Sequence, residues 1–398
     1  MTYILEGLKV VDAATCVAAP AAATMLSDFG ADVIKIESPQ GDGSRLWQGK
    51  SGANCSRLLS SRNKRGICLD LEKPAGRELL KQLLTSADIF LTNFLEQEIR
   101  RFEIEYEVLR QTNPRLIYAH VSDYGDRGPD RNRRDSGIAS WWARTGILDA
   151  LSPLDEQAIN STLGIGDHVA ALALLSSVMM ALYQREKTGE GRFVSTSLVA
   201  SGCYANGLAL QGAISNKGKR FQEEIELSRP CTRCYRTRDD NSVILVIVSL
   251  VQEWPIIAKA LGHKEWLRET EFREMAVTQR CREEMLSRIA SAIGKLNLKD
   301  LCQMLDQHDL SYSIVEKAGD VISDAHLIEN EIFVKTKSDL PEYEWTVSNP
   351  IFIEGFEKRQ PTKGPEIGEH SLPILKDMGF SDSQIKDLIT AGVVLKSS

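Results

Sequence analysis

The sequence predicts an α/β protein that combines a large doubly wound, Rossmann-like domain with a smaller α+β domain. Short apolar segments alternate with helical segments through the first 125 residues, which is typical of parallel βαβ units. At 398 residues the chain is also longer than one hydrophobic core usually supports, so a second domain is expected. Ligands of doubly wound sheets bind at the carboxyl ends of the strands, which is where a site is expected.

The pattern predicts the elements of both domains in chain order. For the large domain, the expected strands are 8–13, 32–37, 67–71, 89–92, 116–122 and 192–197, and the expected helices are 19–29, 76–84, 106–111, 168–185 and 198–214. Residues 215–228 are polar and charged and are expected to form a linker. Beyond it we expect a strand from 235, strands 242–248, 311–315, 344–347 and 351–353, and helices 254–261, 283–292, 298–307, 372–378 and 382–391.

The composition is that of a globular protein of the cytoplasm. The net charge of -7 argues against nucleic acid or a membrane surface as the main partner. The first residues lack the pattern of a signal peptide, and no uninterrupted apolar run reaches the length of a membrane span. The eight cysteines are expected to be reduced. Cys231 and Cys234 form a lone Cys-x-x-Cys pair, which does not predict a metal site.

The first crossover, residues 13–20, has no G-x-G-x-x-G pattern. Those glycines allow a dinucleotide pyrophosphate to approach the backbone, so an NAD or FAD enzyme is disfavoured.

One carboxylate has an unusual setting, in the stretch Gly164-Ile165-Gly166-Asp167-His168 before a long apolar run. Glycines permit close approach of another molecule, and an acidic side chain at a helix start is stabilised by free N–H groups. This position suits a helix N-cap, the commoner role of such an aspartate, and it also suits a positioned nucleophile. The local pattern alone does not decide between the two.

Three basic groups stand out on this acidic chain. Solvated loops explain most such charge runs, but Arg suits phosphate, and the sheet edge is apolar. Together they favour a ligand with several phosphates and an acyl arm, such as coenzyme A. The groups are Arg57, Arg62, Lys64 and Arg65; Arg100 and Arg101, just after Asn93-Phe94; and Arg127, Arg131, Arg133 and Arg134.

Many motifs in matched order resemble the class III, or CaiB/BaiF, family of CoA-transferases along nearly the whole chain. They are residues 5–12, Ala18-Ala19-Pro20, 29–37, Asn63-Lys64-Arg65, Leu69-Asp70-Leu71, 88–93, 113–117, Tyr124-Gly125, Gly128-Pro129, 187–191 and Gly368-Glu369-His370.

The resemblance implies that Asp167 is the catalytic nucleophile. An ionised carboxylate can attack an acyl-CoA thioester without a general base. The expected reaction moves CoA from an acyl-CoA to a free carboxylic acid through an aspartyl-acyl anhydride and an aspartyl-CoA thioester. CoA and acyl-CoA are then substrates, and no permanently bound cofactor is expected.

The resemblance also implies a CoA site and a substrate site. A contact of Arg101 with phosphate or adenine is expected, and Ser38 stands where several family members have a basic residue. His168 and Trp141 are candidate substrate contacts. The expected CoA-binding residues are Val17, Ala18, Leu69, Glu72, Asn93, Phe94, Leu95 and Arg101.

Domain boundaries and assembly follow from the same resemblance. Residues 1–215, with 330–398 returning to them, are expected to form the large CoA-binding domain, and 225–325 the small one. Segments 215–225 and 325–335 are the expected linkers. Family members form interlocked homodimers, in which two chains thread through each other, and the same assembly is expected here.

Three functions are compatible with the sequence. The pattern around residues 18–22 and 166–168 is similar to transferases that act on 2-hydroxy acids, and Val17 favours an apolar acyl group. A 2-methylacyl-CoA racemase or epimerase needs a second base, which that branch supplies as a histidine; the corresponding residues 135–139 contain none. A non-catalytic CoA-binding protein is the third interpretation.

Overall fold

The computed structural model describes residues 3–47, 54–133, 137–152, 159, 161–162, 164–215, 231–268 and 279–397. The chain divides into two compact units, which we treat separately: residues 1–207 with 325–398 form unit 1, and residues 208–324 form unit 2. The division between the units falls after Gly207, the first residue of α9 (Gly207–Ser215). Residues 208–215, which we expected in the large domain, are therefore grouped with unit 2.

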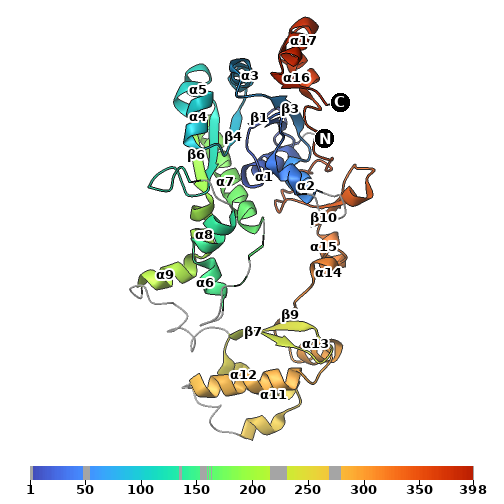
Figure 1. The fold of residues 1–398 in the computed structure, drawn as a ribbon. Coiled ribbons are helices and arrows are strands. Elements are labelled where there is room, and N and C mark those ends of the chain that lie inside the picture. Colours follow the sequence, from blue (N-terminus) through green and yellow to red (C-terminus); the bar gives the residue numbers. More distant parts are fainter. Residues whose placement is uncertain are drawn as a thin grey trace. The chain divides into compact units, whose positions relative to one another are not determined.

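Unit 1 is built on a seven-stranded sheet (Figure 1). The strand order is β12-β3-β2-β1-β4-β5-β6, and the strands are parallel except β12, which runs antiparallel to β3. The order reverses between β1 and β4, so the carboxyl ends of these strands form a topological switch point. The strands are β1 (Lys9–Asp12), β2 (Asp32–Glu37), β3 (Arg65–Leu69), β4 (Ile89–Thr92), β5 (Ile117–Ser122), β6 (Phe193–Ser197) and β12 (Val394–Leu395).

Helices cover both faces of this sheet, which makes it doubly wound. Successive strand side chains point to opposite faces, so Val10 and Val11 of β1 enter different cores. On the Val10 face lie α1 (Ala18–Asp28) and α7 (Ile165–Thr188); on the Val11 face lie α3 (Pro74–Thr85), α4 (Glu96–Phe102), α5 (Tyr106–Thr112), α16 (Ser371–Asp377) and α17 (Asp382–Thr390). The α/β prediction for this part of the chain is confirmed.

Helix α7 is long and apolar enough to cross a membrane. Its Ala170, Leu174 and Val178 are nevertheless completely buried in the core that α7 shares with α1. It is therefore a core helix of unit 1.

Shorter elements complete unit 1. β10 and β11 form a small antiparallel sheet. The elements are η1 (Gly43–Leu46), α2 (Cys55–Ser61), the π-helical turn η2 (Ile138–Ala143), α6 (Ile147–Leu151), α8 (Leu198–Ala205), α15 (Ala325–Glu329), β10 (Phe333–Lys335), η5 (Pro341–Tyr343) and β11 (Trp345–Val347).

Unit 2 packs helices on an antiparallel sheet, β7 (Cys231–Arg236), β8 (Ser242–Ile247) and β9 (Tyr312–Ile314). Its core includes Val243 and Trp254, whose indole stacks on Trp266 with 5.1 Å between ring centroids. The helices are α11 (Leu250–Ala260), η3 (Lys264–Arg268), α12 (Gln279–Ile293), α13 (Leu298–Asp306) and α14 (Ala318–Val321). This is the expected α+β arrangement.

Candidate active site

Asp167 lies inside the first turn of α7. The helix begins at Ile165, three residues earlier than expected, and Gly164 occupies the N-cap position with a left-handed φ of 85°. No side chain caps this helix end, so the interpretation of Asp167 as a plain N-cap is wrong. Gly166 permits a close contact, since a Cβ there would lie 2.4 Å from Cγ of Trp141. The glycines thus let the start of α7 pack directly on Trp141.

The environment makes Asp167 more basic than a free aspartate. Burial raises its pKa, while His168 and the aspartate's own N–H group act in the opposite direction. A Cβ at Gly137 would lie 3.3 Å from Oδ2 of Asp167, so this backbone approaches the carboxylate closely because residue 137 is glycine. A partly desolvated carboxylate with raised pKa is a better nucleophile than a solvated one.

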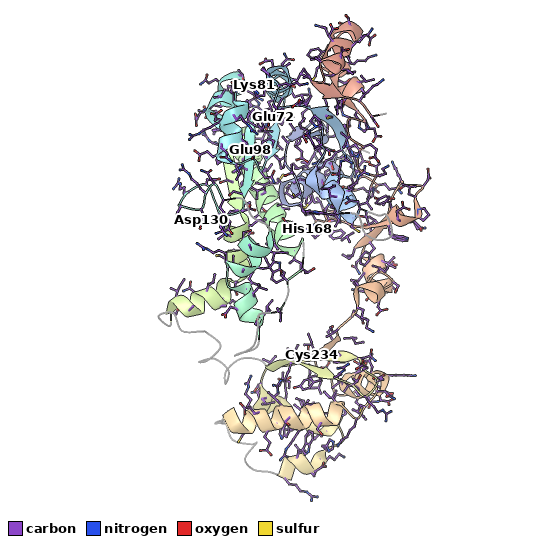
Figure 2. The ribbon with its side chains drawn as sticks, in the orientation of Figure 1. Glu72, Lys81, Glu98, Asp130, His168 and Cys234 are labelled. Carbon is purple, nitrogen blue, oxygen red and sulfur yellow. The ribbon has the colours of Figure 1, made fainter. Side chains whose placement is uncertain are left out.

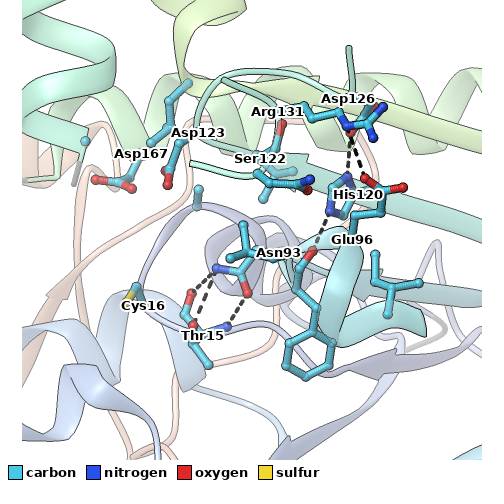
Figure 3. A pocket seen from close by; sticks show the side chains of 18 of the residues that line it. Thr15, Cys16, Asn93, Glu96, His120, Ser122, Asp123, Asp126, Arg131 and Asp167 are labelled. Atoms are coloured by element: carbon cyan, nitrogen blue, oxygen red, sulfur yellow. Dashed lines mark hydrogen bonds and ion pairs between the residues drawn. The ribbon is translucent and has the colours of Figure 1, made fainter. Parts of the chain in front are cut away.

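Asp167 opens into a cavity of about 490 Å³ at the switch point of the sheet (Figure 3). Thr15 and Cys16 enter it from the loop after β1, and Asn93 from the segment after β4. We call it the Asp167 cavity. Its other lining residues include Ala18, Phe94, Leu95, Glu96, His120, Val121, Ser122, Asp123, Asp126, Arg131, Gly137, Phe193 and Leu198.

A second cavity of about 140 Å³ shares Thr15 and Phe94 with the first. Leu69 and Glu72 line it, together with Ser38. Six of the eight residues expected at the CoA site therefore line one cavity or the other: Ala18, Asn93, Phe94 and Leu95 the first, and Leu69, Glu72 and Phe94 the second.

The other two residues expected at the CoA site lie close to these cavities without lining them. Val17 is buried at the N-cap position of α1, beside Ala18. Arg101 is exposed, with Nη2 at 2.9 Å from Oε1 of Glu72, and its guanidinium lies 4.8 Å from the ring centroid of Phe102.

The two candidate substrate contacts lie close to Asp167. His168 follows Asp167 on α7 (Figure 2), and its Nδ1 lies 2.7 Å from the carbonyl oxygen of Gly164. Trp141 is buried under Gly166. Neither is among the described residues that line the Asp167 cavity.

Sequence reasoning missed His120, which lines the Asp167 cavity from β5. Its Nδ1 lies 2.9 Å from Oδ1 of Asp126, and its Nε2 lies 3.0 Å from the carbonyl oxygen of Phe94. The hydrogen bond from His120 is the main reason why the pKa of Asp126 is lower than usual. A histidine near the carboxyl end of a predicted strand was the available signal.

The first basic group does not serve as a phosphate site. Arg62 is buried with Nη2 at 2.7 Å from Oδ2 of Asp28, and Lys64 is buried with Nζ at 2.8 Å from Oδ2 of Asp12. Arg57 pairs with Glu366, and Arg65 pairs with Asp32 and Asp377. The phosphate prediction is wrong for this group because carboxylates distant in sequence neutralise it.

The family model of CoA-transferase family III matches residues 5–371. The chain belongs to this family. It is therefore an enzyme of the CoA-transferase type, as the resemblance implied.

Curated relatives of this family III CoA-transferase match over their whole length. The (R)-2-hydroxy-4-methylpentanoate CoA-transferase of Clostridioides difficile is 27% identical, covering 98% of this chain and 99% of its own. The cinnamoyl-CoA:phenyllactate CoA-transferase of Clostridium sporogenes is 28% identical, covering 97% and 96%. The human alpha-methylacyl-CoA racemase is 26% identical, covering 96% of both chains.

A solved structure supports the fold of this CoA-transferase. The crystal structure of a CAIB/BAIF family protein from Brucella suis superposes with a TM-score of 0.84 at 22% identity, covering 95% of this chain and 100% of the other. Among the described residues, no group of three or more His, Cys, Asp or Glu side chains has the geometry of a metal site.

Proposed function

We propose that this enzyme transfers CoA from an acyl-CoA thioester to a free carboxylic acid, with Asp167 as the covalent nucleophile. The observation that carries the proposal is the placement of this partly desolvated carboxylate in the wall of the Asp167 cavity, at the switch point of the sheet. A family III transferase needs a nucleophile where its thioester substrate is held, and Asp167 is the carboxylate at the glycine-flanked start of α7.

The first half of the reaction forms the covalent enzyme. An Asp167 oxygen attacks the thioester carbonyl carbon, the C–S bond breaks, and an aspartyl-acyl anhydride and CoA thiolate result. The thiolate then attacks the aspartyl carbonyl of the anhydride and releases the donor acid as its carboxylate. Asp167 is left as an aspartyl-CoA thioester. The acceptor carboxylate repeats both steps in reverse and leaves as the new acyl-CoA.

The proposed path of CoA runs through both cavities, which share two of their lining residues. Phe94 and Thr15, which line both, would lie beside the pantetheine arm, whose thiol end must reach Asp167. The nucleotide end would extend toward Leu69 and Glu72, with Arg101 beside it at the surface. CoA is a substrate in this scheme, and no permanently bound cofactor takes part.

We propose a 2-hydroxy acid with an apolar side chain as the acyl group. The transferases from Clostridioides difficile and Clostridium sporogenes are named for (R)-2-hydroxy-4-methylpentanoate and phenyllactate. In this chain Ala18, Val121 and Leu198 give the Asp167 cavity an apolar part. A panel of carboxylic acids offered with acetyl-, succinyl- and butyryl-CoA, read by mass spectrometry of the thioesters formed, identifies the substrate.

A racemase is the second candidate, because a racemase is among the relatives. It needs a base opposite Asp167 across the α-carbon. His120 is the one histidine that lines the Asp167 cavity within the described ranges, and both its ring nitrogens are already hydrogen-bonded. This favours transfer. Deuterium incorporation at the α-carbon without acyl exchange is the result that would establish the racemase instead.

A non-catalytic CoA-binding protein is separated from both enzymes by trapping. After incubation with acyl-CoA, borohydride or hydroxylamine should modify Asp167, as located by peptide mass spectrometry. Asp167→Asn is the control and should show no modification. An active wild-type enzyme with an unmodified Asp167 would exclude the covalent route.

We further propose that the enzyme is an interlocked homodimer in the cytoplasm. Helix α7 exposes an apolar face, with Leu172, Met180 and Tyr183 exposed by 37%, 72% and 66%. A second copy of the chain is the expected cover for such a face. The proposed cytoplasmic location rests on the sequence, in which the cysteines are scattered as reduced thiols are in cytosolic proteins.

A further inference from the structure

Cys16 has an unusual backbone conformation at the candidate active site. Its φ is 66°, in the left-handed region that non-glycine residues rarely adopt. Of the described non-glycine residues with positive φ, Cys16 alone lines the Asp167 cavity. Such a conformation persists only where the surrounding structure holds it in place.

Side chains hold this loop on both sides. From the segment after β4, Asn93 Oδ1 accepts a hydrogen bond from the Thr15 N–H at 2.9 Å, and Asn93 Nδ2 donates to the Thr15 carbonyl at 3.1 Å. From the other side, Asp42 Oδ1 accepts from the Cys16 N–H at 3.1 Å. Lys35 Nζ donates to the Ala14 carbonyl at 3.2 Å.

Lys35 and Asp42 are themselves an ion pair, with Nζ at 3.0 Å from Oδ2 and each side chain exposed by only 3%. Burial lowers the pKa of Lys35, but Asp12, Asp42 and Glu37 together raise it above its ordinary value. Burial raises the pKa of Asp42, but Lys35 and the hydrogen bonds from Ser44 and Cys16 bring it below its ordinary value. Both groups are therefore charged at neutral pH.

A contribution to the stability of the fold is a weak explanation for the presence of the Lys35–Asp42 ion pair. Desolvation of two buried charges offsets much of their attraction, and apolar replacements of such pairs are often neutral or stabilising. The other charges nearby have their own partners, since Asp12 pairs with Lys64 and Glu37 pairs with Arg45. What Lys35 and Asp42 add is a direct hold on the peptide groups of Ala14 and Cys16.

We propose that Lys35 and Asp42 are positioning residues for CoA transfer. They hold the loop 13–17 and the start of α1 in a fixed position relative to Asp167. The proposal rests on the proposed function. Ala18, the first residue of α1, lines the cavity, and no side chain caps the helix at Val17. The first N–H groups of a helix have no partner within it, so a shift of the loop would redirect these donors as well as the cavity wall.

The test compares two double variants. Lys35→Met with Asp42→Asn removes the pair without leaving an unpaired charge, and Asn keeps an acceptor for the Cys16 N–H. The control is Arg62→Met with Asp28→Asn, which removes an ion pair of equal burial; neither residue lines either cavity, whereas Asp42 lines the second one. The readout is kcat per active site, where active sites are titrated by trapping the aspartyl-CoA thioester.

We expect kcat of the Lys35/Asp42 variant to fall by about 10- to 100-fold, because small misplacements of reacting groups have effects of this order. The Arg62/Asp28 variant should stay within about twofold of wild type. Adding Cys16→Gly to the first variant should recover part of kcat, since glycine adopts positive φ without strain. A purely structural role of the pair would change the free energy of unfolding and leave kcat per titrated active site unchanged in both variants.

The outcomes are separable. A folded Lys35/Asp42 variant with wild-type kcat, or equal losses in the two double variants, overturns the positioning role. If this double variant does not fold, Lys35→Gln with Asp42→Asn, which keeps polar side chains at both positions and leaves no unpaired charge, gives the same comparison with and without Cys16→Gly. A wild-type enzyme that forms no aspartyl-CoA contradicts the proposed function itself, and this is measured before any variant.

Discussion

His120 joins two segments of the cavity wall, because Nδ1 lies 2.9 Å from Oδ1 of Asp126 while Nε2 lies 3.0 Å from the carbonyl oxygen of Phe94. The ring therefore connects the loop after β5 to the segment after β4 that is expected to contact CoA. A carboxylate with a lowered pKa and a carbonyl are both acceptors, so each ring nitrogen of His120 faces a hydrogen-bond acceptor.

Replacing His120 should weaken binding of acyl-CoA more than the chemical step. We expect His120→Gln to raise KM for acyl-CoA by about 5- to 30-fold, the equivalent of one lost charge-assisted hydrogen bond, with kcat within about threefold of wild type. Steady-state kinetics check this. Asp126→Asn should give a similar KM, and the double variant should be no worse than either single variant. Additive losses would mean that the two residues act independently.

Gly166 should tolerate no side chain. A Cβ there would lie 2.4 Å from Trp141 Cγ, so Gly166→Ala must displace the indole or the first turn of α7 that carries Asp167. We expect a loss of about 1–3 kcal/mol in the free energy of unfolding and at least a tenfold fall in kcat.

Gly207→Ala is the matched control for this substitution, since nothing lies within 4 Å of a Cβ at that position. It should leave both the stability and kcat near wild type. Denaturant unfolding and steady-state kinetics check both variants. A fully active Gly166→Ala enzyme would show that the close packing on Trp141 does not position Asp167.

The sequence was sufficient for six of the seven strands of the sheet and missed only the two-residue edge strand β12. The strand at 89–92 was predicted to the residue, because a short apolar run between helical segments has few other interpretations. The start of α7 was placed three residues late, since Gly164 and Gly166 resemble a loop when their contact with Trp141 is unknown.

The buried charges could not be assigned from the sequence. Lys64 stood in a run of basic residues that resembled a phosphate site, but its partner Asp12 is 52 positions away. A pairing of this kind depends on how strands and helices stack. The same limit applies to His120 and to the Lys35–Asp42 pair, whose roles depend on neighbours brought together by the sheet.

Asp167→Asn should remove activity and stabilise the fold. Because the proposed function makes Asp167 the nucleophile, kcat should fall by at least about 1,000-fold. Because burial raises the pKa of Asp167, its ionised form is disfavoured in the folded chain. The unfavourable contribution begins as pH rises through the unfolded value near 3.8 and is complete above the folded pKa.

At pH 7 we therefore expect the asparagine variant to melt roughly 1–3 °C above wild type. The difference should vanish below about pH 3.8. Thermal melts of the two proteins between pH 3.5 and about pH 8 check the sign. A variant that melts below wild type at pH 7 would show that the ionised carboxylate is favoured by its surroundings.

The exposed face of α7 leads to the last prediction, on assembly. Met180 and Tyr183 are exposed by 72% and 66% on one face of α7, whose opposite face is buried in the core of unit 1. If a second chain covers this face, wild type should sediment as a dimer of about twice 44.3 kDa. Met180→Asp should then shift the equilibrium toward monomer by at least tenfold in Kd, because it buries an unpaired charge at the interface.

Glu186→Gln, at an exposed polar position of the same helix, is the control for this substitution and should leave the dimer intact. A wild-type monomer, or a Met180→Asp protein that dimerises like wild type, would contradict this assignment of the α7 face.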